Sequence, residues 1–198
     1  TSRLNDTGTQ KYPGIMTSRT SADTTPNCLT EITPLTDRKT TVTSALTAMI
    51  INRGSYQPST YIPGGAIWGV NMLSPTAPLD EAAAYQDTNR NPRKIMVLMT
   101  DGANTMRFNA GNGTHSDTTN AAQLTATNND TAAICSYAKS KGIEIYTVAL
   151  AVNSTAARSL LEGCASSDDH YFDARDSRTL ARAFADIAAS IYRVRIVE

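Results

Sequence analysis

Residues 94–102 read KIMVLMTDG, and this stretch decides the fold class. Residues 95–99 form a continuous apolar run, which predicts a central strand that is buried on both faces of a parallel sheet. The run ends at Thr100, Asp101 and Gly102, where a polar segment begins. Because ligands of open parallel sheets bind outside the carboxyl ends of the strands, these three residues are the first candidates for a functional site.

Further along the chain, strands alternate with helices. Residues 143–152, IEIYTVALAV, predict a second buried strand, and His170 to Phe172 predict a short third one. The spacing of apolar side chains predicts helices over residues 42–54, 62–73, 131–141, 154–161 and 177–191, the last three capped by Asp130 or Thr131, by Ser154 and by Ser177. This alternation predicts an α/β fold with a mainly parallel central sheet and helices on both faces.

The order of the strands can also be predicted. We expect residues 95–100, 143–150 and 170–173 to be parallel neighbours, and 28–33 to form a separate edge strand.

Length and charge exclude several classes of protein. The chain has 198 residues, which fits one domain, with 18 Lys and Arg against 18 Asp and Glu. Net neutrality without a basic run argues against recognition of nucleic acid or of an anionic membrane. Residues 1–27 are polar and predict an arm or loop. Residues 103–128 are rich in Asn, Thr and Gly and predict a long insertion that is functional or mobile.

The local pattern around Asp101 leaves two interpretations open. A carboxylate at the end of a buried strand can hold a divalent cation or polarise a substrate, and it can equally cap the following turn through its own backbone. The sequence contains neither G-x-G-x-x-G nor G-x-x-x-x-G-K-[ST], so a nucleotide site is not indicated. Nothing resembles a pair of nucleophile and base, and we therefore expect no enzymatic activity.

Five blocks of the sequence, taken in order, resemble the von Willebrand factor A domain of bacterial Tad-type pilus assembly proteins (the TadE/TadG-like group). They are STYIPGGAIWGVNMLSP (59–75), KIMVLMTDGANT (94–105), AAICSYAKSKGIEIYTVAL (132–150), LLEGCASSDDHYFDA (160–174) and ARAFADIAASIYRVRI (181–196). The resemblance implies a Rossmann-like fold in which residues 28–198 are the C-terminal part of a single von Willebrand factor A-like domain. It also implies a non-enzymatic adhesion or pilus-assembly module that binds protein partners. A structural surface or pilus subunit with a vestigial metal site is the alternative.

By the same resemblance, Thr60 and Asp101 match two positions of the family's metal-ion-dependent adhesion site. Their hydroxyl and carboxylate oxygens suit Mg²⁺, and equally Mn²⁺ or Ca²⁺. The D-x-S-x-S loop of the family has no counterpart in this chain, so the ion can be absent. We expect a second chain or fragment to supply the missing N-terminal strands. The resemblance places the protein in the periplasm or at the cell surface, with membrane anchoring only through a segment outside this chain.

The chain has three cysteines, so at least one of them lacks a partner within the chain. The residues alone are also compatible with three free thiols. A disulfide needs two Cα atoms close together, and a position in the middle of one helix need not lie beside a position at the end of a parallel neighbour. The family resemblance implies that Cys135 and Cys164 pair in an oxidising envelope compartment. Cys28 is then left for an upstream partner.

Overall fold

The computed structural model describes residues 32–49, 59–76, 79, 81–86, 88–90, 92–111 and 113–193. The chain divides into two units, each of which is described by itself. One unit comprises Thr60–Asn104 and Thr125–Glu198, and the other comprises Thr1–Ser59 and Thr105–Leu124. The larger unit contains the parallel sheet and therefore the candidate site at its carboxyl edge.

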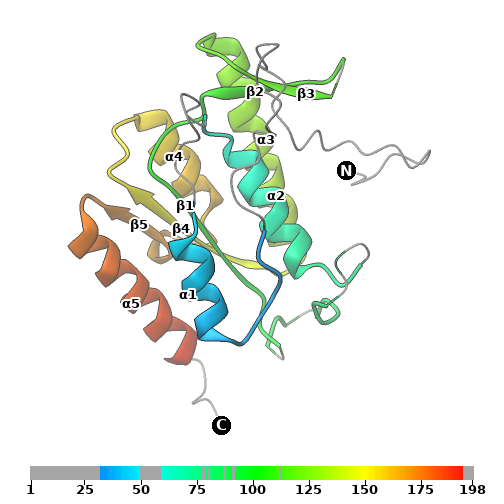
Figure 1. Cartoon of the computed structure of the whole chain (residues 1–198), viewed down its shortest axis with the longest axis vertical. Coiled ribbons are helices and arrows are strands. Elements are labelled where there is room, and N and C mark those ends of the chain that lie inside the picture. The colour runs from blue at the N-terminus through cyan, green and yellow to red at the C-terminus, as the bar shows by residue number, and fades with distance from the viewer. Residues whose placement is uncertain are drawn as a thin grey trace. The chain divides into compact units, whose positions relative to one another are not determined.

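A three-stranded parallel sheet forms the centre of the larger unit, in the order β1-β4-β5 (Figure 1). Its strands are β1 (Ile95–Thr100), β4 (Glu144–Leu150) and β5 (Tyr171–Ala174). The register places Ile95 opposite Glu144 and Thr147 opposite Tyr171. The predicted parallel neighbours and the α/β fold are thus confirmed.

Helices lie against both faces of this sheet (Figure 1). One face packs against α2 (Ile62–Leu73), α3 (Ala121–Ser140) and α4 (Thr155–Cys164), and the opposite face packs against α5 (Ser177–Arg193). A short 3-10 helix, η1 (Asp168–His170), precedes β5. The backbone N–H of Ala157 donates to the Ser154 side chain, which confirms the predicted cap of α4. The cap of α5 is Asp176 instead of Ser177, since its carboxylate accepts from the backbone N–H of Thr179.

The prediction that β1 is a central strand buried on both faces is wrong. β1 lies at one edge of the described sheet and pairs with β4 alone. Met96 and Leu98 are buried on the face under α2, whereas Val97 and Met99 on the other face are 38% and 47% exposed. The physical reason is that α5 lies over β4 and β5 and reaches β1 only at Ile95, so Val97 and Met99 remain partly exposed.

A network of polar side chains fixes the amino end of β4. The guanidinium of Arg93 donates to both carboxylate oxygens of Glu144, at 2.7 and 2.5 Å. The Tyr146 hydroxyl donates to Glu144 at 2.7 Å and lies 2.9 Å from the Ser190 hydroxyl of α5. Arg93 also donates to the carbonyl of Ile191. These bonds attach the last turns of α5 to the sheet and leave the ionic groups of the network partnered.

The smaller unit contains α1 (Lys39–Thr47) and an antiparallel hairpin formed by β2 (Met106–Asn109) and β3 (Thr114–Asp117). The hairpin and the first part of α3 lie within the predicted insertion, 103–128, so much of this stretch has regular structure. Of the other predictions for the N-terminal region, the arm at 1–27 lies outside the described residues. The strand at 28–33 also lies outside them, except for its last two residues, which form no strand.

The cap of helix α3 lies ten residues before Asp130, the first of the two caps that the sequence predicted. This cap is Asn120, whose side-chain oxygen accepts from the backbone N–H groups of Ala122 and Gln123. Thr131, one of the two predicted caps, lies inside the helix, where its hydroxyl donates to the carbonyl of Thr127. The early turns of α3 carry few apolar residues, so a search for hydrophobic periodicity does not detect them.

Within the part of the chain that is described, no helix combines the length and the apolar character that crossing a membrane requires.

Candidate functional site at the carboxyl end of β1

The candidate site begins with the turn that follows β1. The Thr100 hydroxyl donates to the carbonyl of Gly102 at 3.0 Å and accepts from the N–H of the same residue at 3.3 Å. Thr100, and not Asp101, therefore closes this turn. Asp101 is exposed, and among the described residues its carboxylate has no hydrogen-bond partner. The interpretation of Asp101 as the cap of its own turn is therefore not supported by the structure.

Asn104 connects this turn to the start of α2. The backbone N–H of Ile62 donates to the Asn104 side-chain oxygen at 2.7 Å in a buried hydrogen bond. The Asn104 amide in turn donates to Asn128 of α3 at 2.8 Å. Tyr61, the residue at the N-cap position of α2, makes no capping bond through its side chain, so Asn104 satisfies this helix end from a distance. The segment that carries Thr60 and the turn that carries Asp101 are thereby joined through one amide.

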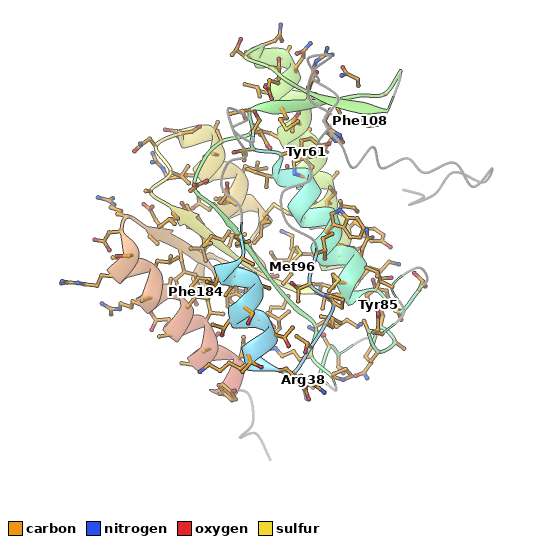
Figure 2. All side chains as sticks on the ribbon, viewed as in Figure 1. Arg38, Tyr61, Tyr85, Met96, Phe108 and Phe184 are labelled. Atoms are coloured by element: carbon orange, nitrogen blue, oxygen red, sulfur yellow. A yellow bond between two sulfur atoms is a disulfide. The ribbon has the colours of Figure 1, made fainter. Side chains whose placement is uncertain are left out.

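Tyr61 contributes a phenol next to this connection, at the start of α2 (Figure 2). Burial, and secondly the negative charge of Asp130, raises the pKa of Tyr61 to about 12. Burial also raises the pKa of Asp130 above its ordinary value. Tyr61 therefore remains a neutral hydroxyl even above pH 10, and it can act as a hydrogen-bond donor at the start of α2.

The described residues contain no group of three or more His, Cys, Asp or Glu side chains that could together hold a metal ion. Thr60 and Asp101 offer one hydroxyl and one carboxylate, which fit a hard cation by donor type but do not complete its usual set of six or more oxygens. That they share an ion remains a prediction. Asn104, which joins their two segments, was missed at the sequence level because a single amide in a polar stretch gives no periodic signal.

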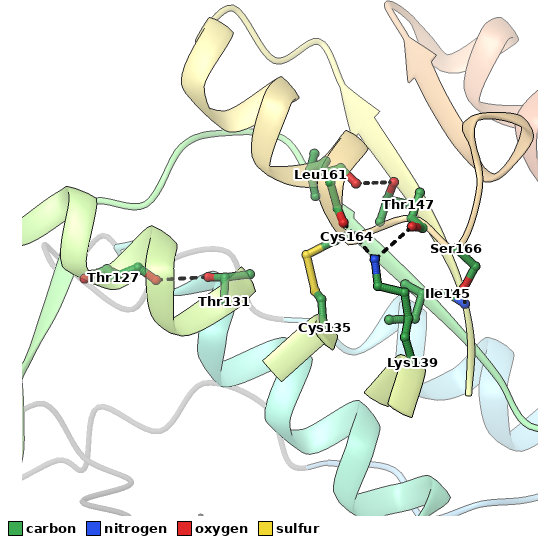
Figure 3. The surroundings of a disulfide bond; sticks show 11 residues. Thr127, Thr131, Cys135, Lys139, Ile145, Thr147, Leu161, Cys164 and Ser166 are labelled. Atoms are coloured by element: carbon green, nitrogen blue, oxygen red, sulfur yellow. Dashed lines mark hydrogen bonds between the residues drawn. A yellow bond between two sulfur atoms is a disulfide. The ribbon is translucent and has the colours of Figure 1, made fainter. Parts of the chain in front are cut away.

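Cys135 of α3 and Cys164 of α4 form a disulfide, with their Cα atoms 5.2 Å apart (Figure 3). The two positions lie level because Cys164 is the last residue of α4 and α3 continues only five residues beyond Cys135. The Lys139 ammonium strengthens the same junction by donating to the carbonyls of Gly163 and Ala165 at 2.9 and 3.2 Å (Figure 3). Because disulfides persist in oxidising compartments, this bond fits a protein that lies outside the cytoplasm.

Comparison with known proteins gives a likeness to the crystal structure of the pilus adhesin SpaC from Lactobacillus rhamnosus GG, with a TM-score of 0.53 and 19% sequence identity. The likeness is one of fold. It covers 78% of this chain and 21% of the adhesin, so the chain spans about a fifth of that protein's length. No family model matches the chain, and the search of curated proteins gives no significant match. The parallel α/β sheet is consistent with a von Willebrand factor A-like fold.

Proposed function

We propose that this chain is part of a von Willebrand factor A domain of the Tad-type pilus assembly group and acts as a non-enzymatic adhesion or assembly module in the periplasm or at the cell surface. The observation that carries the proposal is the bond from Ile62 to Asn104, because it joins the segments of Thr60 and Asp101 at the carboxyl edge of a parallel sheet. The fold likeness to a pilus adhesin and the Cys135–Cys164 disulfide support the same function.

In this proposal Asp101 and Thr60 bind a divalent cation, Mg²⁺ or in its place Mn²⁺ or Ca²⁺. The Asp101 carboxylate is exposed and has no ionic partner among the described residues, so it is available to a cation. The cation would supply an open coordination position for a carboxylate of the partner protein. Water and a D-x-S-x-S loop, which this chain lacks, would complete the oxygen ligands.

The open edge of β1 supports a second part of the proposal, namely that a further polypeptide segment adds strands there. The Lys94 carbonyl accepts from the N–H of Glu144, so it points toward β4. Because backbone groups alternate in direction along a strand, those of Ile95, Val97 and Met99 point away from β4. An apolar strand with unpaired backbone groups promotes unwanted association unless it is covered. We propose the amino-terminal part of the same precursor as the source of the covering strands and of the D-x-S-x-S loop.

The cation proposal is tested by titrating the ¹⁵N-labelled chain with Mn²⁺ and recording paramagnetic broadening of amide signals by NMR. We expect broadening centred on Thr60 and Asp101, reversal by a chelator, and loss of the effect in Asp101→Asn. Asp186→Asn is the matched control, since Asp186 is an exposed carboxylate on α5. Broadening that persists unchanged in Asp101→Asn would contradict the assignment.

The alternative function is a structural surface or pilus subunit with a vestigial metal site. The free edge of β1 in the described sheet supports this alternative, because strand addition there needs no metal ion. Joining the chain to a longer precursor segment distinguishes the two. If protection of the Val97 and Met99 amides from hydrogen exchange rises while Mn²⁺ has no effect, the structural alternative holds. Hydrolysis of a phosphoester or ester panel that is lost in Asp101→Asn would contradict the non-enzymatic assignment in both versions.

A further inference from the structure

A polar pocket lies at the carboxyl ends of β4 and β5, one strand removed from the turn that carries Asp101. Its volume is about 570 Å³, within the range of pockets that bind small ligands and peptide side chains. The pocket is lined by Ala151, Val152, Asn153, Arg158, Asp173 and Arg175. In parallel α/β folds this edge of the sheet is where ligands bind. None of these residues belongs to the site proposed above.

One residue that lines the pocket has an unfavourable backbone conformation. Ala151 has a φ of +51°, in the left-handed region that residues with a side chain rarely adopt. Its N–H donates to the carbonyl of Ala174 at 2.7 Å, so the backbone is held where β4 ends. Non-glycine residues in this conformation concentrate at functional sites, because the surrounding structure must maintain them. The chain turns here, directly before Val152 and Asn153 enter the wall of the pocket.

Arg158 is fixed in place by two contacts. Its guanidinium donates to the carbonyl of Val152 at 2.7 Å and to the Thr155 hydroxyl at 3.4 Å. A guanidinium carries five N–H groups, so this anchored side chain keeps further donors for a ligand. An arginine whose orientation is already set loses less entropy on binding a carboxylate than a mobile one does.

Arg175 is the exposed cation of the pocket. Its side chain is 82% exposed, and its Nε atom lies 3.9 Å from Asp173, so this pair contributes little to stability. The pocket thus holds two guanidinium groups and one carboxylate, with a net charge of +1. A bound monoanion brings the net charge of the pocket to zero. A phosphate dianion would bring it to −1 and would be repelled more strongly by the carboxylate of Asp173. Asn153 adds an amide that can bond to a peptide group.

We infer that this pocket binds a single peptide carboxylate of a protein partner, with Arg158 and Arg175 as its two guanidinium donors. The carboxylate can belong to a glutamate or aspartate side chain or to a C-terminus, since both present the same planar pair of oxygens. Arginine recognises such a pair through parallel N–H···O bonds. This contact needs no metal ion and is independent of Asp101.

The test is an NMR titration of the whole chain with three peptides in the presence of a chelator. The probes are acetyl-Gly-Glu-Gly-amide for a side-chain carboxylate, acetyl-Gly-Gly-Gly with a free C-terminus, and acetyl-Gly-Gln-Gly-amide as the uncharged match. We expect at least one of the two carboxylate peptides to shift the amide signals of Ala151 to Asn153 and the Nε–H signal of Arg158. The peptide that binds identifies the source of the carboxylate. The glutamine peptide is expected to shift none of them.

Arg158→Gln and Arg175→Gln should each weaken this binding at least tenfold, whereas Arg182→Gln, an exposed arginine of α5, should not. If Arg158→Gln does not fold, Arg175→Gln carries the test, because that side chain is exposed. Asp101→Asn should bind as the wild type does, which separates this site from the proposed cation site. Equal shifts with the glutamine peptide, stronger binding of inorganic phosphate, or equal weakening in Arg182→Gln would overturn the inference.

Discussion

Strands β1 and β4 pair residue by residue along one sheet, yet their environments differ sharply. In β4 all residues from Ile145 to Ala149 are buried, whereas in β1 only Met96 and Leu98 are. Both strands read as apolar runs in the sequence. The difference teaches that an apolar run specifies a strand but not its neighbours. β4 has strands on both sides and helices on both faces, and β1 has one strand and one covered face among the described residues.

The largest expected effect compares a fully buried side chain of β4 with an exposed one of β1. Ile145→Ala should lower the free energy of unfolding by about 4 kcal/mol, because it leaves a cavity under α3 and α4. Met99→Ala should cost less than about 1 kcal/mol, because its side chain already contacts solvent. Urea unfolding followed by circular dichroism measures both. Equal losses of stability would mean that Met99 is covered in solution, and they would contradict the difference in burial between β1 and β4.

The disulfide strengthens the covered face further. Replacing both cysteines, Cys135→Ala with Cys164→Ala, should lower the free energy of unfolding by about 3 kcal/mol, since the crosslink closes a loop with a sequence separation of 29. Adding a reductant to the wild type should reproduce this loss. The same reductant should leave the double variant unchanged, and a further loss there would assign the effect to another cause.

A substitution at Gly69 of α2 tests how tightly the covered face of β1 is packed. A Cβ atom at this position of α2 would lie 2.6 Å from the Met96 sulfur, so Gly69→Ala should cost about 1 kcal/mol by forcing that side chain aside. In a Met96→Ala background the same change should become neutral or stabilising, because alanine favours the helix over glycine. A double-mutant cycle in urea tests this. Additive costs would show that the close approach of α2 to β1 is not the cause.

The smallest expected effect concerns two charged residues at the amino ends of the strands, Glu144 in β4 and Lys94 directly before β1. Glu144 has Arg93 as its ionic partner, whereas Lys94 is buried and donates to the carbonyls of Leu73 and Ala83. Burial lowers the pKa of Lys94 below its ordinary value of 10.5. The unfolded chain therefore binds more protons than the folded chain just below pH 10.5, and stability should rise with pH in that window. Lys94→Met should remove this slope from the pH dependence of unfolding, and an unchanged slope would assign it to another group.

The sequence predicted the positions of β1 and β4 well, because their apolar runs and the alternation with helices are local signals. It failed on the exposure of Val97 and Met99, since burial depends on which elements lie beside a strand. It also missed the β2-β3 hairpin and the first turns of α3, where polar side chains such as Asn120 determine the start of the helix. Short polar segments give no hydrophobic period to read.

For the candidate site, the sequence identified Asp101 by its place after a strand, and the family resemblance added Thr60. It could not identify Asn104, because the importance of that amide comes from meeting Ile62 and Asn128, which are distant in the chain. The pocket of Arg158 and Arg175 was missed for the same reason. Arg158 lies in the first turn of α4 and Arg175 directly follows β5, so only the fold brings the two arginines together.

The position of the disulfide has a mechanical consequence. Strand β4 lies entirely between Cys135 and Cys164, so the central strand of the sheet is enclosed in a covalent loop. A force that pulls the two ends of the chain apart would be transmitted through the sulfur–sulfur bond and would bypass β4. At about 3.5 Å per extended residue, the loop would withhold roughly 100 Å of extension. In a module under tension, the middle strand of the described sheet would thus stay out of the path of the force for as long as the bond remains oxidised.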